Sequence, residues 1–138
     1  MKYNKVMMKT AFIWAEMSYC KRAKVGAVIA KDNRILVASY NGTVSGANNC
    51  CEEEKENELV SKNTVVHAEI NAIAYAAKNG IKTDDCTIYI TLSPCVECSK
   101  AIIQCGIKKV FYKTEYRDIS GIEFLKENNI SVEQIQDI

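Results

Sequence analysis

Two short motifs contain the residue types that hold metal ions and move protons. HAE occupies residues 67–69, and PCVEC occupies residues 94–98. Each motif opens a run of apolar residues at helical spacing, so both should lie at helix N-termini. His67, Cys95 and Cys98 supply one imidazole and two thiolates, a set of ligands that Zn²⁺ prefers. Three protein ligands leave one tetrahedral position open, which distinguishes a catalytic zinc site from a structural one.

The spacing within the motifs favours a working site. Cys95 and Cys98 are three residues apart on the expected helix, so their side chains share a face and can reach one metal. The positive end of the helix favours both thiolates. Zinc lowers the pKa of a bound water to ~7, and Glu69 is then the natural carrier of that water's proton. The Ala68 N–H, at the same helix start, is available to hold a carbonyl group of the substrate.

Each of these residues also has a simpler interpretation. A Cys-x-x-Cys pair is as often half of a structural zinc site, His67 alone could be a core or capping histidine, and Glu69 alone suits the first turn of a helix. A structural site needs a fourth ligand, but His67 is the only histidine and the other cysteines lie far away in the sequence. The combination of both motifs therefore favours a catalytic zinc centre.

The composition limits the class of partner. The 138 residues fit one domain over 1–138, and 48% of them are hydrophobic and 25% charged. The formal net charge is +1, which gives no broad attraction for nucleic acid and favours a small-molecule partner. The N-terminus lacks the apolar stretch of a signal peptide, and no apolar run approaches the ~20 residues that span a membrane. We therefore expect a cytoplasmic protein that binds neither nucleic acid nor membrane.

Hydrophobic periodicity places the two motifs in an alternating series of elements. We expect helices over 4–20 (with Asn4 as N-cap), 67–79, 95–105 and 120–128, and strands over 25–30, 35–40, 87–91, 110–112 and 130–135. The first two strands form a hairpin around Asp32-Asn33, and 42–64 is an acidic loop with a short helix over 53–59. Strands that alternate with helices predict an α/β fold, with a mostly parallel sheet after the hairpin.

With these motifs in place, the chain closely resembles the deoxycytidylate (dCMP) deaminases of the cytidine deaminase superfamily. The zinc motifs follow the His-x-Glu and Pro-Cys-x-x-Cys signature of zinc-dependent nucleobase deaminases. The resemblance implies a three-layer α/β/α sandwich around a five-stranded mixed sheet, with strands four and five parallel. It also implies a Zn²⁺-dependent conversion of dCMP and water to dUMP and ammonia, in which Glu69 protonates the ring nitrogen and the departing ammonia.

The dCMP interpretation is narrower than the superfamily and rests on two segments. One is HAEINA, in which Asn71 follows the glutamate and is a candidate for substrate binding. The other is YNGTVSGANNC over 40–50, in which Asn41 aligns with the family asparagine that bonds the sugar. Two other functions stay open. One is deamination of another substrate, such as cytidine, guanine or tRNA adenosine, and the other is a catalytically silent zinc-binding module, against which the intact Glu69 argues.

A nucleotide monophosphate needs cationic side chains or helix-end amides around its phosphate. Lys21, Arg22 and Lys24 lie just before the first strand, and Arg117 follows the fourth strand, on the side where active sites of open sheets form. From this set we select Lys24 and Arg117 as the phosphate ligands. Tyr116 is a candidate to stack on the sugar or the base.

The resemblance also bears on assembly and regulation. Enzymes that look like this are commonly hexamers, activated by dCTP and inhibited by dTTP, so a homo-oligomer with these effectors is implied. Some relatives hold a second, structural zinc with a histidine in a longer insert before the HAE helix. Here the insert is short, lacks histidine and is acidic, which disfavours a triphosphate. Cys20, Cys50 and Cys51 lack an evident fourth ligand, and with seven cysteines in all we expect buried thiols rather than disulfides.

Overall fold

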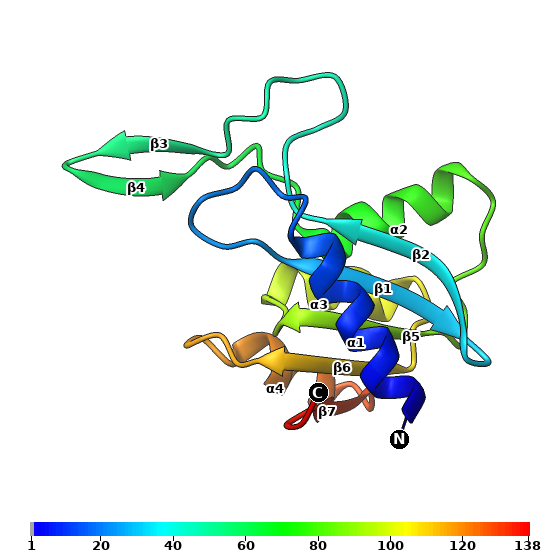
Figure 1. Cartoon of the computed structure of the whole chain (residues 1–138). Coiled ribbons are helices and arrows are strands. Elements are labelled where there is room, and N and C mark those ends of the chain that lie inside the picture. The colour runs from blue at the N-terminus through cyan, green and yellow to red at the C-terminus, as the bar shows by residue number, and fades with distance from the viewer. Residues whose placement is uncertain (1) are drawn as a thin grey trace.

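The centre of the molecule is a five-stranded sheet in the order β2-β1-β5-β6-β7 (Figure 1). The computed structural model describes residues 2–138. The strands are β1 (Gly26–Lys31), β2 (Arg34–Tyr40), β5 (Thr87–Leu92), β6 (Lys109–Thr114) and β7 (Ser131–Gln134). β1 is antiparallel to β2 and β5, whereas β6 is parallel to both β5 and β7. The predicted five-stranded mixed sheet with parallel fourth and fifth strands is confirmed.

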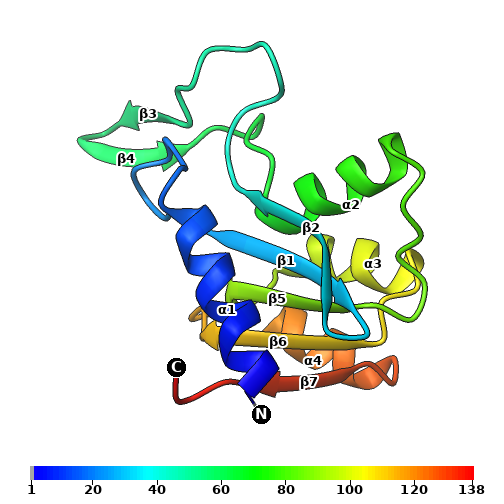
Figure 2. The same ribbon diagram turned by 45° about the vertical axis from the view of Figure 1, so that its right-hand side comes forward.

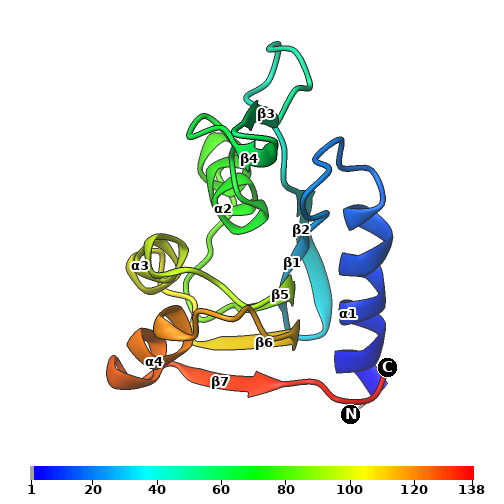
Figure 3. The ribbon, with the colours of Figure 1, turned by 90° about the vertical axis from the view of Figure 1, so that its left-hand side faces the viewer.

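Helices cover both faces of this sheet. α1 (Lys2–Ala15) lies alone on one face, and α2 (Ala68–Lys78), α3 (Val96–Gln104) and α4 (Ser120–Glu127) lie on the other (Figure 3). The larger apolar core lies on the side of the three helices and includes Ile29, Ile88, Ile90, Ala72, Ile102 and Leu125. The core beneath α1 includes Met7, Met8, Ala11, Val28, Tyr89 and Phe111. The predicted three-layer sandwich is therefore confirmed.

At two contacts between elements the backbones approach so closely that only glycine fits. A Cβ on Gly26 would collide with the Ala11 carbonyl of α1, and a Cβ on Gly121 would collide with the Pro94 carbonyl. At the second contact, Ser99 Oγ donates to the Cys95 carbonyl at 2.8 Å and to the Gly121 carbonyl at 3.2 Å. The start of α4 thus fixes the turn that carries the PCVEC motif.

The acidic insert contains a second, two-stranded sheet where a short helix over 53–59 was predicted. β3 (Glu52–Lys55) and β4 (Glu58–Ser61) pair antiparallel and extend from the rest of the molecule (Figures 1 and 2). The turn residues Glu56 and Asn57 have φ of 50° and 64°. Two positive φ values in succession make the type of two-residue turn that matches the twist of a hairpin, so the predicted helix is wrong.

The first helix also differs from its predicted bounds. α1 spans Lys2–Ala15 and contains Asn4, so the predicted bounds of 4–20 and the predicted N-cap at Asn4 are wrong. The Asn4 side chain has another partner, since its Oδ1 accepts a hydrogen bond from the Tyr89 hydroxyl at 2.7 Å. No helix of residues 2–138 is long and apolar enough to cross a membrane.

The cysteines near the insert do not follow the expectation of free buried thiols. Cys20 and Cys51 form a disulfide across a sequence separation of 31, and Cys50 is an exposed free thiol. The disulfide joins the segment after α1 to the base of the β3–β4 hairpin, and Figures 1 and 2 show the two side by side. The expectation failed because it considered each cysteine through composition, whereas pairing depends on how distant segments meet.

Candidate active site

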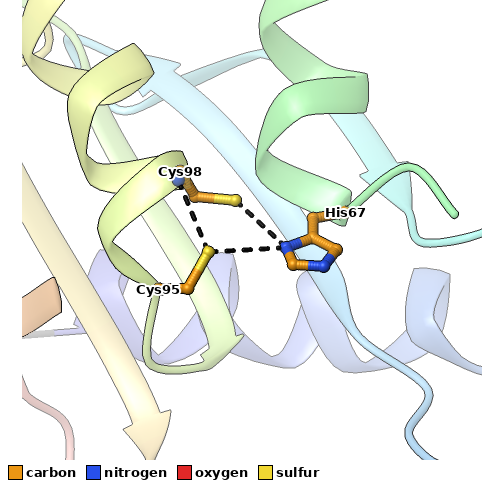
Figure 4. Close-up of side chains that lie close together, drawn as sticks. All are labelled: His67, Cys95 and Cys98. Atoms are coloured by element: carbon orange, nitrogen blue, oxygen red, sulfur yellow. Dashed lines mark hydrogen bonds between the residues drawn. The ribbon is translucent and has the colours of Figure 1, made fainter. Parts of the chain in front are cut away.

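Two helix N-termini bring the HAE and PCVEC motifs together. His67 is the N-cap of α2, and Cys95 is the N-cap of α3 directly after β5, both with extended backbone. His67 Nδ1 lies 3.3 Å from Cys98 Sγ and 3.6 Å from Cys95 Sγ (Figure 4). The Cys98 N–H points at Cys95 Sγ, with a separation of 3.5 Å. The structure therefore gathers the three predicted metal ligands around one point.

The geometry and chemistry of this cluster fit zinc. The candidate ligand atoms of His67, Cys95 and Cys98 all lie within 4.8 Å of one another. Nitrogen and sulfur ligands of one tetrahedral zinc ion are separated by about 3.5 Å when the bonds are about 2.1 and 2.3 Å long. The observed separations of 3.3 and 3.6 Å agree with that value. One imidazole and two sulfurs, without a carboxylate, are a set that favours zinc over magnesium or calcium.

The pKa values of the three candidate ligands shift in different directions in the metal-free chain. Hydrogen bonds from Cys98 and then His67 lower the pKa of Cys95 to about 4. The pKa of Cys98 is raised, first by its hydrogen bond with Cys95 and then by burial. The pKa of His67 is raised, chiefly through its hydrogen bond with Cys95. Cys95 is therefore a thiolate at neutral pH, and a thiolate is the form of cysteine that binds metals.

Glu69 lies in the first turn of α2 and is buried beside the cluster. Burial is the largest influence on its pKa and raises it to about 7. A carboxyl group with a pKa near neutrality can both accept and donate a proton at physiological pH. Perturbed carboxyl groups of this kind are typical of catalytic sites.

His67, Glu69 and Cys95 open into a cavity of about 310 Å³, within the size range of small-molecule pockets. Its other walls come from the segment before β1, the ends of β2, β4 and β5, and the loop after β6. The lining residues are Cys20, Arg22, Ala23, Val25, Asn41, Glu52, Ser61, Lys62, Val65, His67, Ala68, Glu69, Leu92, Ser93, Cys95 and Tyr116.

Three of the six predicted substrate contacts line this cavity: Asn41, Ala68 and Tyr116. Asn41 is also structural, because its Oδ1 accepts from the Val25 N–H and its Nδ2 donates to the Ala23 carbonyl, both at 2.9 Å. Ala68 is the first residue of α2, so its N–H has no acceptor within the helix.

The other three predicted contacts lie elsewhere. Lys24 and Arg117 are exposed and do not line the cavity. Asn71 lines a neighbouring cavity and donates from Nδ2 to the Tyr40 carbonyl at 2.9 Å, which joins α2 to the end of β2.

Five polar residues that line the cavity were not selected from the sequence: Arg22, Glu52, Ser61, Lys62 and Ser93. Arg22, Ser61 and Lys62 line it together, and Arg22 Nη1 donates to Ser61 Oγ at 3.2 Å. Arg22 belonged to the basic segment considered above, but its sequence gave no reason to prefer it over Lys24. Ser61 is the last residue of β4 and Lys62 follows it. A short helix was predicted from the sequence in this region, so these two residues were not considered.

Comparison with known proteins identifies the family. Residues 1–114 match the family described as the cytidine and deoxycytidylate deaminase zinc-binding region. The chain belongs to this deaminase family. The chain is 36% identical to ComE operon protein 2 of Bacillus subtilis, over 97% of its own length and 71% of the relative's. It is 35% identical to the deoxycytidylate deaminase of Enterobacteria phage T4, over 80% and 77% of the two lengths.

A solved structure extends the likeness to three dimensions. The dCMP deaminase of cyanophage S-TIM5, in complex with dCMP and dUMP, superimposes with a TM-score of 0.90. The two chains are 41% identical, and the match covers 97% of each. Zinc is the cofactor of the present chain, and the cluster of His67, Cys95 and Cys98 is the candidate site for the ion.

Proposed function

We propose that the chain hydrolyses dCMP to dUMP and ammonia. The observation that supports this proposal most strongly is the cluster of His67, Cys95 and Cys98 beside the buried Glu69, at a cavity of about 310 Å³. The choice of substrate is supported by the S-TIM5 enzyme, which is named a dCMP deaminase and holds dCMP and dUMP. Identity of 41% over nearly the whole of both chains makes a shared substrate the best-supported assignment.

Glu69 carries the proton in this reaction. When bound by His67, Cys95 and Cys98, zinc lowers the pKa of a coordinated water to ~7 and so supplies a nucleophile. A carboxylate oxygen of Glu69 takes the first proton of the attacking water and delivers it to the ring nitrogen of cytosine. It then takes the second proton, from the hydroxyl group added at C4, and gives it to the amine as the C4–N bond breaks and the carbonyl of dUMP forms. In the metal-free chain, burial raises the pKa of Glu69 to about 7, so the carboxyl group already holds a proton more readily than an exposed glutamate does. Burial of Glu69 keeps bulk water away from the proton.

Neighbouring groups orient the base and the sugar. The N–H of Ala68, free of a helical acceptor, donates to the ring carbonyl. Val25 and Leu92 give the cavity apolar walls against which the ring packs. Asn41 retains one amide hydrogen for the sugar, because only one of its two Nδ2 hydrogens is needed for the Ala23 carbonyl.

In this proposal the phosphate of the substrate binds beside Arg22, Ser61 and Lys62, which line the same cavity. Two cations and a hydroxyl that line the same cavity form a suitable anion site, and the Arg22–Ser61 hydrogen bond fixes part of it. This arrangement favours Arg22 over the sequence-based choices of Lys24 and Arg117. Tyr116 lines the cavity with its N–H held by Ser93 Oγ at 2.8 Å, which suits the predicted stacking on sugar or base.

We also propose that the chain forms a homo-oligomer through α1. Tyr3, Val6 and Ile13 follow one another at helical spacing on its outer face and are 44%, 55% and 61% exposed. Rows of exposed apolar side chains of this kind mark protein interfaces. Sedimentation measurements test the assembly, and a monomer at all concentrations would refute it. Hexamer formation, dCTP and dTTP control, a single domain over 1–138 and cytoplasmic location stay predictions.

Ammonia release by the purified, zinc-loaded chain tests the substrate. The panel contains dCMP, deoxycytidine, dCTP, guanine and a tRNA anticodon stem, with Glu69→Ala as the inactive control. Turnover of dCMP above all others, abolished by Glu69→Ala, is the expected result. Preference for another compound would keep the chemistry and reject the substrate, and silence across the panel with zinc bound would reject the enzyme.

A further inference from the structure

The carboxylate of Glu52 is buried at the cavity without a cation beside it. Glu52 begins β3, is 8% exposed and lines the cavity. Its Oε2 accepts the backbone N–H of Lys21 at 2.8 Å and that of Arg22 at 3.1 Å. None of the ion pairs found among residues 2–138 involves Glu52. A buried carboxylate is costly unless it is well bonded, so these two amides are its compensation.

The segment held by this carboxylate has no regular structure of its own. Residues 20–25 belong to neither helix nor strand, and 21–24 are exposed. Backbone of this kind has many accessible conformations, and its ordering has to come from contacts with other elements. By taking two successive N–H groups, Glu52 fixes the backbone at Arg22 and the direction in which the arginine side chain leaves it.

Other contacts hold the same junction and show that it is built as a unit. The Cys20–Cys51 disulfide lies directly beside it in sequence, and the Lys62 N–H donates to the Cys51 carbonyl at 2.8 Å. Directly across the hairpin from Glu52, Ser61 Oγ accepts from the Arg22 guanidinium at 3.2 Å. Glu52 therefore contacts the backbone of Arg22, while Ser61 contacts its side chain.

We propose that Glu52 is a positioning residue that orients Arg22 toward the phosphate of the substrate. The inference rests on the proposed function, since it takes Arg22 to be a phosphate ligand. Glu52 itself accepts hydrogen bonds from the protein and, as an anion, does not bind the phosphate. Its contribution is to order Arg22 before the substrate arrives, which reduces the entropy lost on binding. The effect should therefore fall on substrate affinity and depend entirely on Arg22.

A double-mutant cycle between Glu52 and Arg22 tests this dependence. Calorimetry measures the Kd of dUMP for the zinc-loaded full chain, and kinetics give KM and kcat for dCMP. We expect Arg22→Ala to weaken dUMP binding by about 10- to 100-fold, as for loss of a charged hydrogen bond. Glu52→Ala should weaken it about 10-fold, with KM raised and kcat changed by less than about twofold. The double variant should bind no worse than Arg22→Ala alone.

Two further variants keep the test sharp. Glu52→Gln keeps an oxygen that can accept both amides, so it should recover most of the affinity. Glu54→Ala, an exposed glutamate on the same strand, should match the wild type. If Glu52→Ala does not fold, as circular dichroism would reveal, the same cycle is run with Glu52→Thr, whose side chain suits a strand but is too short to replace the carboxylate at both amides.

Additive effects of the two substitutions, or an equal fall in kcat and rise in KM, would overturn the positioning role. Because dUMP binding needs no turnover, the proposal can fail alone: tight dUMP binding with additive effects rejects Glu52 and leaves the function intact. Absence of both dUMP binding and dCMP turnover rejects both together.

Discussion

Two groups of residues that line the cavity are held in place by different means: His67, Glu69 and Cys95, here called the metal end, and Arg22, Ser61 and Lys62, here called the phosphate end. At the metal end, His67 and Cys95 are the N-caps of α2 and α3, two helices whose buried residues share the larger core with the sheet. At the phosphate end, Arg22 lies on an irregular segment held by a disulfide, a buried carboxylate and a projecting hairpin. The first arrangement follows from local sequence, and the second exists only through contacts between distant segments. The difference predicts that changes at the two ends will act on different parameters.

The largest expected effect belongs to the metal end. Glu69→Gln keeps the volume of the side chain but cannot carry a proton, so kcat for dCMP should fall by about 10²- to 10⁴-fold. KM and zinc content, measured by atomic absorption, should stay close to the wild type. A Glu69→Gln protein that retains a tenth or more of wild-type kcat would show that another group moves the proton.

Loss of the disulfide should lower the stability of the chain and weaken substrate binding at the phosphate end. Cys51→Ala opens a loop of 31 residues between the two cysteines, and closure of such a loop is worth about 3–4 kcal/mol. We expect the free energy of unfolding, from denaturant titration, to fall by about that amount. KM for dCMP should rise more than kcat falls. Cys50→Ala is the matched control, because Cys50 is exposed and unbonded to sulfur, and it should change neither quantity.

In the metal-free protein, Glu69 should lower stability as the pH rises. Its pKa is raised from 4.5 to about 7 by burial, so the folded chain keeps a proton that the unfolded chain releases between these values. Below pH 4.5 both states are protonated and there is no penalty; above pH 7 the penalty is complete, on the order of 3 kcal/mol. Glu69→Gln lacks this titration and should be more stable than wild type at pH 8 but equal at pH 4.

Urea unfolding of the chelator-treated proteins at several pH values measures this difference. Its growth between pH 4.5 and 7 is the expected result. A stability difference independent of pH would show that Glu69 is not held protonated in the metal-free chain.

The smallest expected effects separate neighbouring cations. Arg22→Ala should raise KM for dCMP by about 10- to 100-fold, which corresponds to about 1.5–3 kcal/mol for hydrogen bonds to a charged group. Lys24→Ala and Arg117→Ala, which remove exposed cations outside the cavity, should change KM by less than about threefold. Steady-state kinetics with dCMP rank the three variants. A larger effect on KM at Lys24 or Arg117 than at Arg22 would show that the residues selected from the sequence bind the phosphate.

The same division explains what could be predicted from sequence. His67, Cys95 and Cys98 could be recognised from the short motifs in which they occur, and hydrophobic periodicity correctly placed those motifs at the starts of helices. The central sheet followed from alternation of strands and helices. In contrast, nothing local distinguishes Arg22 from Lys24, two residues away, because only the docked hairpin gives one of them a partner in Ser61.

The hairpin itself was missed for a physical reason. Its strands are short, charged and mostly exposed, so they lack the apolar alternation by which strands are found. Its turn has no glycine, and Glu56 adopts a positive φ that is uncommon for its residue type. The Cys20–Cys51 pair depends on the same docking, since composition alone favoured free thiols.

The central claim is that a zinc ion at His67, Cys95 and Cys98 supports deamination of dCMP. The most direct measurement adds zinc stepwise to chelator-treated protein and records both bound zinc and ammonia release from dCMP. We predict that activity rises in proportion to bound zinc and saturates at one ion per chain, and that Cys98→Ala neither binds the ion tightly nor releases ammonia. Full activity of the metal-free chain, or of Cys98→Ala, would contradict the account.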